Sequence, residues 1–221
     1  MSVLRDRIAA VQARIARACD AADRDPDSVE LLPVSKRQPL ALIEEAAALG
    51  FARFGENYVQ EGAGKAAARP DLAFTLIGPL QRNKAKAALQ AFAELQTVDR
   101  ADLAERLGRI AEELDVRRGI WIQMDLWNEA TKVGGCGEAE LPALLNAVQA
   151  APRLDLKGLM AIPPPTEPQA FVQLAHLRDE LQQRLGKPLR LSMGMSGDLE
   201  AAIAAGSDQV RIGTAFFGER N

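Results

Sequence analysis

The stretch Val-Glu-Leu-Leu-Pro-Val-Ser-Lys-Arg-Gln-Pro, residues 29–39, contains one complete strand-to-helix junction. Its first six residues form a short apolar run rich in strand formers, which predicts a buried strand that stops just before Lys36. Pro39 then begins a helix expected to run to Gly50, because proline is favoured in the first turn of a helix and glycine just after the last. A buried strand followed at once by a helix is the repeating unit of an α/β fold.

The same alternation extends in both directions from this unit. Upstream, Leu4, Ile8, Val11, Ile15 and Ala18 recur at helical spacing and predict an amphipathic N-terminal helix. Downstream, apolar strand-like runs alternate with helical patterns to the end of the chain. Strands are expected at 51–54, 72–77, 95–98, 118–126, 156–162, 189–192 and 209–212, and helices at 58–68, 83–92, 101–114, 138–150, 168–185 and 197–205, followed by a last helical turn.

Strands that alternate with helices pair in parallel through right-handed crossovers. About eight such units in 221 residues favour a single (β/α)₈ barrel of the TIM type, with the extra helix at the N-terminus, over a two-layer open sheet. No linker, low-complexity tract or block of like charge divides the sequence. Residues 1–221 are therefore predicted to form one domain.

The composition excludes several classes of function. The chain has 27 Lys and Arg against 30 Asp and Glu, so the net charge is −3, and its basic residues are scattered, unlike those of a nucleic-acid-binding face. The single histidine, His176, and the two distant cysteines, Cys19 and Cys136, offer neither a zinc-ligand pattern nor a disulfide framework. Without a signal peptide or an apolar run long enough for a membrane span, the chain is expected to be cytoplasmic.

Lys36 is the most unusual residue at a predicted strand end. In a barrel of this type, functional groups gather on the loops that follow the carboxyl ends of the strands. An amine at the barrel mouth would have its stem in apolar surroundings and Arg37 beside it, and both disfavour the ammonium form. A neutral amine is the form that makes Schiff bases. The alternative is a strand-end lysine whose side chain extends into solvent.

The loops after the seventh and eighth strands have the composition of a phosphate site. Such loops hold phosphate in many barrels through small residues and free backbone N–H groups. Ser196 is a hydroxyl donor and an expected N-cap, and Gly213 and Thr214 follow the last strand. The alternative is a capped helix without a ligand, and Asp198 and Glu200 argue against an anion unless they face solvent.

Arg211 lies within the eighth strand and points away from the apolar Val210 and Ile212 on either side. An arginine inside a barrel needs an acceptor, because an unpaired buried charge is costly. The candidates are a carboxylate, such as that of Glu56 or Asp125, or a pyridine nitrogen. Lysine, a phosphate loop and this arginine together are the groups that pyridoxal phosphate requires.

Several motifs resemble those of the pyridoxal phosphate homeostasis protein family, the YggS/PROSC group. They occur in the family's order over almost the whole chain, and the combination is not a general feature of barrels. The motifs are Val34-Ser35-Lys36, 54–61 (Phe-Gly-Glu-Asn-Tyr-Val-Gln-Glu), Ile77-Gly78 with Leu80-Gln81 and Asn83-Lys84, Gly158-Leu159-Met160, 191–196 and 210–218.

The resemblance implies a barrel similar to the N-terminal domain of alanine racemase, with pyridoxal 5′-phosphate held as an internal aldimine on Lys36. It further implies that Arg211 meets the pyridine nitrogen and that Asn57 lines the pocket near the ring. Ser196, Gly213 and Thr214 would hold the phosphate. Two departures affect the barrel mouth: Pro79 replaces a common histidine, and Asp125-Leu126-Trp127-Asn128 replaces a polar stretch, whereas Lys132 matches.

The resemblance implies a protein that binds and delivers the cofactor and keeps vitamin B6 and amino-acid pools balanced, with no established catalytic reaction. The chain is expected to be a monomer, with pyridoxal phosphate and apo-enzymes that require it as partners. An amino-acid racemase is the alternative, with Lys36 as one base. In racemases of similar fold the second base is a tyrosine from a second domain, for which this sequence has no counterpart. Tyr58, the one tyrosine, is expected to be structural.

Overall fold

The computed structural model describes residues 2–127, 134–164, 167 and 169–219. Asn128 and Lys132, which the family resemblance singled out, lie outside the described residues. So does Pro168, at the start of a predicted helix.

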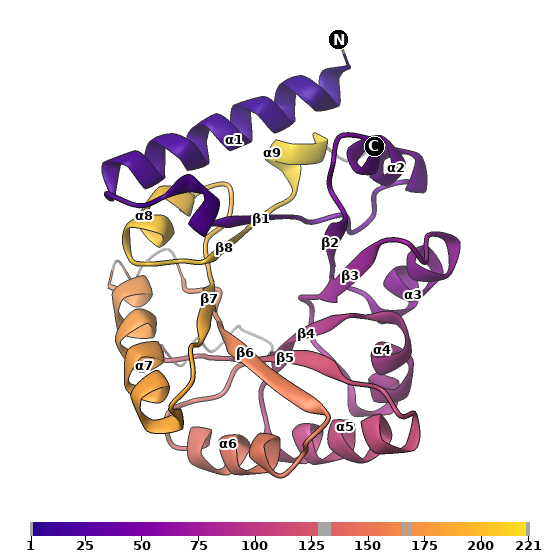
Figure 1. Cartoon of the computed structure of the whole chain (residues 1–221), viewed down its shortest axis with the longest axis vertical. Coiled ribbons are helices and arrows are strands. Elements are labelled where there is room, and N and C mark those ends of the chain that lie inside the picture. Colours follow the sequence, from indigo (N-terminus) through magenta and orange to yellow (C-terminus); the bar gives the residue numbers. More distant parts are fainter. Residues whose placement is uncertain (1, 128–133, 165–166, 168, 220–221) are drawn as a thin grey trace.

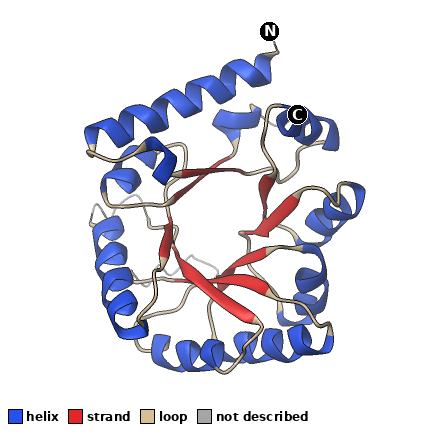
Figure 2. Ribbon diagram, in the orientation of Figure 1, coloured by secondary structure: helices blue, strands red, loops and turns tan. Residues whose placement is uncertain are grey.

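A ring of eight parallel strands forms the centre of the described structure (Figures 1 and 2). The strands follow one another in the order β1-β8-β7-β6-β5-β4-β3-β2. They are β1 (Glu30–Pro33), β2 (Arg53–Glu56), β3 (Ala73–Leu76), β4 (Glu94–Val98), β5 (Arg118–Gln123), β6 (Leu154–Met160), β7 (Arg190–Ser192) and β8 (Gln209–Ile212).

Helices surround this ring, and α1 lies across α8 and α9 on its outside (Figure 1). The arrangement confirms the predicted (β/α)₈ barrel with an additional N-terminal helix. The helices are α1 (Val3–Ala21), α2 (Leu40–Ala48), α3 (Val59–Ala68), α4 (Ala85–Ala91), α5 (Ala101–Glu113), α6 (Leu141–Gln149), α7 (Ala170–Leu185), α8 (Leu199–Ala204) and α9 (Thr214–Phe217), with short 3₁₀ turns at Pro26–Ser28 and Arg82–Lys84.

Some strand boundaries differ from the predicted ones. The second strand was predicted at 51–54, but β2 begins at Arg53 and continues through Glu56. A charged residue is tolerated inside this strand because the Glu56 carboxylate is buried against a lysine ammonium and a serine hydroxyl. The fifth strand was predicted at 118–126 and ends at Gln123, and the sixth, predicted at 156–162, is shifted to Leu154–Met160.

The barrel closes between β1 and β2 at a junction we call the seam. In the described residues these two strands meet through one parallel bridge, Val34 to Gly55, whereas β1 pairs with β8 at four successive positions. The amide of Ser35 donates to the carbonyl oxygen of Gly55 over 2.9 Å. Leu32, Val34 and Ile77 pack together beside this bridge and form a small apolar cluster separate from the main core.

The main core fills the space between the strands and the outer helices. It contains fully buried aromatic side chains such as Phe54, Phe74 and Phe92, and burial of this kind supplies most of the driving force for folding. Cys19 and Cys136 are free thiols buried in this core, and burial raises the pKa of the Cys136 thiol to about 11. In the described residues no helix is both long and apolar enough to cross a membrane.

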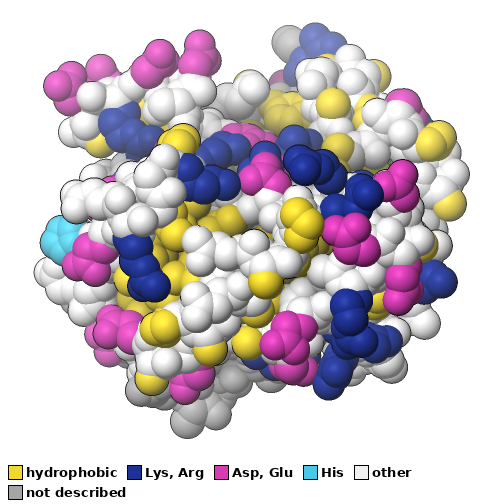
Figure 3. All heavy atoms as spheres, turned by 60° about the horizontal axis from the view of Figure 1, so that its bottom comes forward, with side chains coloured by type: hydrophobic (Ala, Val, Ile, Leu, Met, Phe, Trp, Pro, Cys, Tyr) yellow, Lys and Arg dark blue, Asp and Glu magenta, His cyan; other side chains and the backbone are white. Residues whose placement is uncertain are grey.

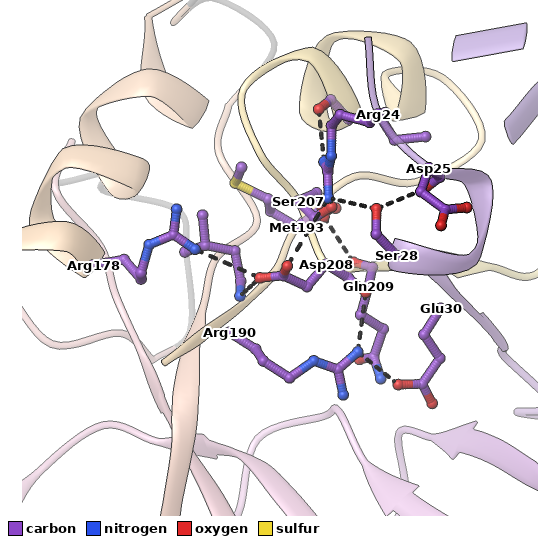
Figure 4. A network of polar contacts seen from close by, with 12 residues as sticks. Arg24, Asp25, Ser28, Glu30, Arg178, Arg190, Met193, Ser207, Asp208 and Gln209 are labelled. Carbon is purple, nitrogen blue, oxygen red and sulfur yellow. Dashed lines mark hydrogen bonds and ion pairs between the residues drawn. The ribbon is translucent and has the colours of Figure 1, made fainter. Parts of the chain in front are cut away.

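A polar network holds the amino-terminal end of the barrel together, where β1, β7 and β8 begin (Figure 4). Arg24 donates to the carbonyl oxygens of Ile203 and Ser207, and Arg190 donates to Glu30 and to the carbonyl of Asp208. Arg24 thereby connects the segment after α1 to α8 and to the loop before β8, and Arg190 connects β7 to the starts of β1 and β8. Lys and Arg side chains lie among Asp and Glu side chains over the face shown in Figure 3.

Gly158 of β6 allows the backbone of β7 to approach closely. A Cβ placed there would collide with the backbone carbonyl of Arg190, its parallel partner. We expect Gly158→Ala to lower the free energy of unfolding by about 1–3 kcal/mol, the usual cost of overpacking. Gly64→Ala is the matched control, because nothing lies within 4 Å of a Cβ at this exposed position in α3, and it should raise stability slightly. Equal stability of the two variants in urea unfolding would contradict this account of β6 and β7.

Candidate functional site

A cavity of about 290 Å³ opens at the carboxyl-terminal end of the barrel. The structure brings all six residues predicted from the sequence to its wall, although they come from four separate segments of the chain. Val34, Ile77 and Ile162 add apolar surface, and Met195 and Gly197 complete the lining. The six predicted residues are Lys36, Asn57, Ser196, Arg211, Gly213 and Thr214.

Lys36 follows β1 and is half-buried at the pocket. The backbone on both sides of it is fixed. The amide of Ser35 bonds to Gly55, and the amide of Arg37 donates to Oε1 of Glu61 over 2.5 Å. Arg37 has a φ of 58°, a left-handed conformation that is uncommon for a residue with a side chain and that therefore needs support from its surroundings.

Four residues next to Lys36 form a hydrogen-bonded polar group, here called the Lys65 cluster: Ser35, Glu56, Glu61 and Lys65. All but Glu61, which is partly exposed, are buried. The Glu56 carboxylate is fully buried, and its Oε1 accepts from the Ser35 hydroxyl over 2.6 Å and from Lys65 Nζ over 2.7 Å. Burial raises the pKa of the Glu56 carboxyl, against the opposing effect of its hydrogen bonds from Lys65 and Ser35. The sequence analysis missed this cluster. The available signal was Glu61 and Lys65 at i,i+4 in a helix that follows a strand ending in Glu56.

Arg211 lines the pocket and is buried. Of the two kinds of partner considered from the sequence, the hydrogen bonds of the described structure use neither: Nη1 donates to the carbonyl oxygen and hydroxyl of Ser192, and Nη2 donates to the carbonyl of Ala161. The guanidinium therefore donates to backbone carbonyl oxygens at the ends of β6 and β7. These oxygens carry no formal charge, so they do not neutralise the guanidinium. Burial lowers the pKa of Arg211 to about 10, so the side chain is still a cation at neutral pH.

Residues 195–197 and 213–214, here called the anion loops, present donors to the pocket. In the part of the chain that the structure describes, the backbone N–H groups of Ser196, Gly197 and Thr214 have no protein acceptor. Two hydroxyls, on Ser196 and Thr214, lie beside them. Free N–H groups and hydroxyls converging on one wall are suited to phosphate.

Ser196 was predicted to cap the helix that follows, and this was wrong. The helix begins at Leu199, and Asp198 occupies its N-cap position. The Asp198 carboxylate folds back to accept from the amide of Met195 over 2.5 Å, which closes a tight turn around Ser196. Asp198 makes no side-chain capping hydrogen bond to the helix, and Ser196 lies two residues before the N-cap position, so its hydroxyl is left at the pocket wall.

Glu200 is held away from the pocket by an arginine of α1. Arg14 makes three hydrogen bonds of 2.8 to 2.9 Å to the Glu200 carboxylate and also donates to the carbonyl of Ser196 over 3.1 Å. Glu200, one of the two acidic residues that argued against an anion site, is therefore paired with Arg14. The same arginine also stabilises the anion loop through its hydrogen bond to the Ser196 carbonyl. This contact gives the additional N-terminal helix a direct part in shaping the site.

Asn57 is positioned by the close approach of the next strand end. A Cβ on Gly78 would collide with the backbone of Asn57, and the carbonyl of Gly78 accepts from the Thr97 hydroxyl over 2.8 Å. The Asn57 Oδ1 atom is buried and has no hydrogen-bond partner among the described residues. A buried acceptor without a donor is costly, which makes it a contact point for a ligand.

The sequence departures do not line the cavity as far as the structure describes it. Pro79 is exposed after β3, and Trp127 donates through Nε1 to Gln173 over 2.7 Å. Tyr58 is 47% exposed and its ring lies against the Arg37 guanidinium, outside the residues that line the pocket. His176 is exposed on α7, as predicted.

Comparison with known proteins adds independent information. The family described as the alanine racemase N-terminal domain matches residues 7–221. A pyridoxal phosphate homeostasis protein from Pseudomonas aeruginosa is 45% identical over 100% of this chain and 97% of its own length. The structure of PipY from Synechococcus elongatus with PLP bound is similar with a TM-score of 0.84, 37% identity and coverage of 97% of this chain and 100% of PipY.

More distant structures share the fold. Alanine racemase from Clostridium difficile is similar with a TM-score of 0.74 and 13% identity, over 94% of this chain and 56% of the racemase. At that level of identity the likeness concerns the barrel alone.

The pairing of Arg14 with Glu200 has a measurable signature. Partial burial acts to raise the pKa of Glu200, but the hydrogen bonds from Arg14 and from its own backbone bring the net value below the ordinary one. A carboxyl whose pKa is lower in the folded than in the unfolded protein stabilises the fold at pH values above its unfolded-state pKa. This stabilisation is lost as the pH falls through the folded-state pKa. In NMR titrations we expect Arg14→Ala to raise the Glu200 pKa and Arg17→Ala to raise it less. A larger effect of Arg17→Ala would contradict the pairing.

Proposed function

The chain belongs to the alanine racemase N-terminal domain family and, within it, to the pyridoxal phosphate homeostasis proteins, and on this premise we propose that it binds pyridoxal 5′-phosphate in the pocket described above. Its role would be intracellular vitamin B6 homeostasis. PipY, whose structure contains PLP, is similar over nearly the full length of both chains and supports this proposal. We further propose that the protein acts in the cytoplasm as a single-domain monomer that supplies apo-enzymes.

One observation carries the assignment: the amine, the cation and the anion-binding donors face the same cavity. The anion loops offer three backbone N–H groups and two hydroxyls, enough for a phosphate monoester. The unpartnered Oδ1 of Asn57 offers an acceptor of the kind that a ring hydroxyl satisfies. Val34, Ile77 and Ile162 provide apolar surface suited to an aromatic ring.

Lys36 would bind covalently. Pyridoxal phosphate brings an aldehyde and an electron-accepting ring, and a neutral lysine amine condenses with the aldehyde to a C=N bond with release of water. The chain contributes a lysine whose backbone is fixed on both sides and whose side chain lies at the pocket wall.

Arg211 would set the electronic character of the bound ring. A guanidinium that stays charged at neutral pH donates a hydrogen bond to a pyridine nitrogen but does not protonate it. An unprotonated ring is a weaker electron sink than one paired with an acidic partner. The site therefore favours holding the cofactor over strong activation of an amino-acid substrate.

The covalent link is tested with the purified protein and PLP. Wild type should show the visible absorbance band of a Schiff base, and after borohydride reduction mass spectrometry should locate the adduct on Lys36. Lys36→Ala should lose both signals, because the amine that forms the bond is gone. Lys86→Ala, on the exposed face of α4, is the control and should behave as wild type. Reduced cofactor attached elsewhere in Lys36→Ala, at the wild-type level, would refute the site assignment.

The racemase alternative is tested on the same preparations. Racemisation needs a base on each face of the substrate α-carbon, and Tyr58 does not line the described pocket. We therefore expect wild type to invert alanine and other amino acids no faster than free PLP at the same concentration, measured by chiral chromatography. Inversion well above that background, abolished in Lys36→Ala, would replace the carrier assignment with an enzymatic one.

A further inference from the structure

The residues on either side of Lys36 are held by one buried ammonium group. Lys65 Nζ, on α3, donates to the carbonyl oxygen of Ser35, to Oε1 of Glu56 and to Oε1 of Glu61, each over 2.7 Å. An ammonium has three N–H bonds, so these three acceptors use all of them. The direction of Lys65 is thereby fixed, and with it the peptide that leads into Lys36.

Glu61 extends the same contact to the other side of Lys36. Its Oε1 accepts both from Lys65 Nζ and from the backbone amide of Arg37. Arg37 is in the left-handed region, a conformation that a residue with a side chain keeps only where its surroundings hold it. The amide of Gln38 also returns to the carbonyl of Ser35 over 3.0 Å, which completes a tight turn with Lys36 inside it.

Stability alone does not account for this arrangement. Lys65 is 9% exposed and Glu56 is fully buried, and a buried ion pair is often replaced by apolar residues without loss of stability. One oxygen of Glu56, Oε2, has no hydrogen-bond partner among the described residues, so the cluster keeps an energetic penalty. The Lys65 cluster also lies at the seam, where the β1 and β2 backbones meet through a single bridge in the described structure.

We propose that Lys65 is a positioning residue that, held by Glu56 and Glu61, fixes the Ser35 to Arg37 backbone so that the Lys36 amine faces the pocket. This role rests on the proposed function, because it concerns the lysine that would bind the cofactor. Lys65 does not line the pocket as described and would act through the turn, without touching the ligand.

The variants are chosen to separate geometry from folding. Lys65→Met keeps the length of the side chain and removes its charge and its donors, which leaves the Glu56 charge buried and uncompensated. The double variant Lys65→Met with Glu56→Gln removes that charge as well and keeps an acceptor for the Ser35 hydroxyl. Lys86→Met makes the same substitution at an exposed position on α4 and is the matched control.

Two readouts are measured beside urea unfolding. In the cofactor-free proteins, amide hydrogen exchange at Arg37 and Gln38 should become at least about tenfold faster in both Lys65→Met variants, since the groups that hold the turn are lost. Both Lys65→Met variants should bind PLP about tenfold more weakly than wild type, a loss of affinity that corresponds to roughly one hydrogen bond. Both should also form less borohydride-reducible adduct at Lys36. The double variant should regain most of the stability lost in Lys65→Met without regaining affinity.

The outcomes decide between positioning and packing. If exchange at Arg37 and Gln38 and affinity for PLP return to wild-type levels together with stability in the double variant, Lys65 has only a structural role and the proposal is overturned. If wild type and Lys86→Met form no adduct at Lys36, the proposed function fails instead. In that case the exchange rates in the cofactor-free proteins still show whether Lys65 fixes the turn.

Discussion

The ammonium group of Lys65, bonded to the Ser35 carbonyl and to two carboxylates, joins the two edges of this barrel. Longer ladders join strand pairs such as β1 with β8 and β5 with β6, whereas β1 and β2 meet in the described structure through the Val34 to Gly55 bridge, and β7 and β8 are likewise paired at one position. A buried charge cluster strengthens that junction with directional contacts, which an apolar patch of the same size would not supply. Closure of the barrel and presentation of Lys36 therefore depend on the same group of atoms.

The polar groups at the two ends of the barrel differ in whether the fold satisfies them. At the amino-terminal end, Arg24 and Arg190 are satisfied by carbonyl oxygens and by Glu30, and their contacts hold strand starts in place. At the carboxyl-terminal end, Asn57 Oδ1 and the amides of the anion loops are left without protein partners in the described part of the chain. Polar groups that the fold leaves unsatisfied in this way are suited to a ligand. Helix α1 links the outer layer to this end, because Arg14 braces the loop at Ser196.

Much of the fold could be predicted from the sequence, because hydrophobic periodicity records which faces are buried. The alternation of strands and helices fixed the barrel, and strand ends pointed to Lys36, Ser196, Arg211 and Thr214, all of which line one cavity. The partners of Arg211 could not be predicted in this way. The Arg211 partners are the backbone of Ala161 and the backbone and hydroxyl of Ser192, and backbone carbonyls have no signature in the sequence.

By itself, then, the sequence determined the order of the elements and the kinds of side chain at the barrel mouth, since both follow from local pattern and composition. Only the tertiary structure decided which groups satisfy one another. Glu56 was predicted to follow its strand, yet it lies inside β2, because Lys65 and Ser35 approach it from segments nine and twenty-one residues away. The partner of a buried charge is chosen by distance in space, and that distance is set only when the barrel closes.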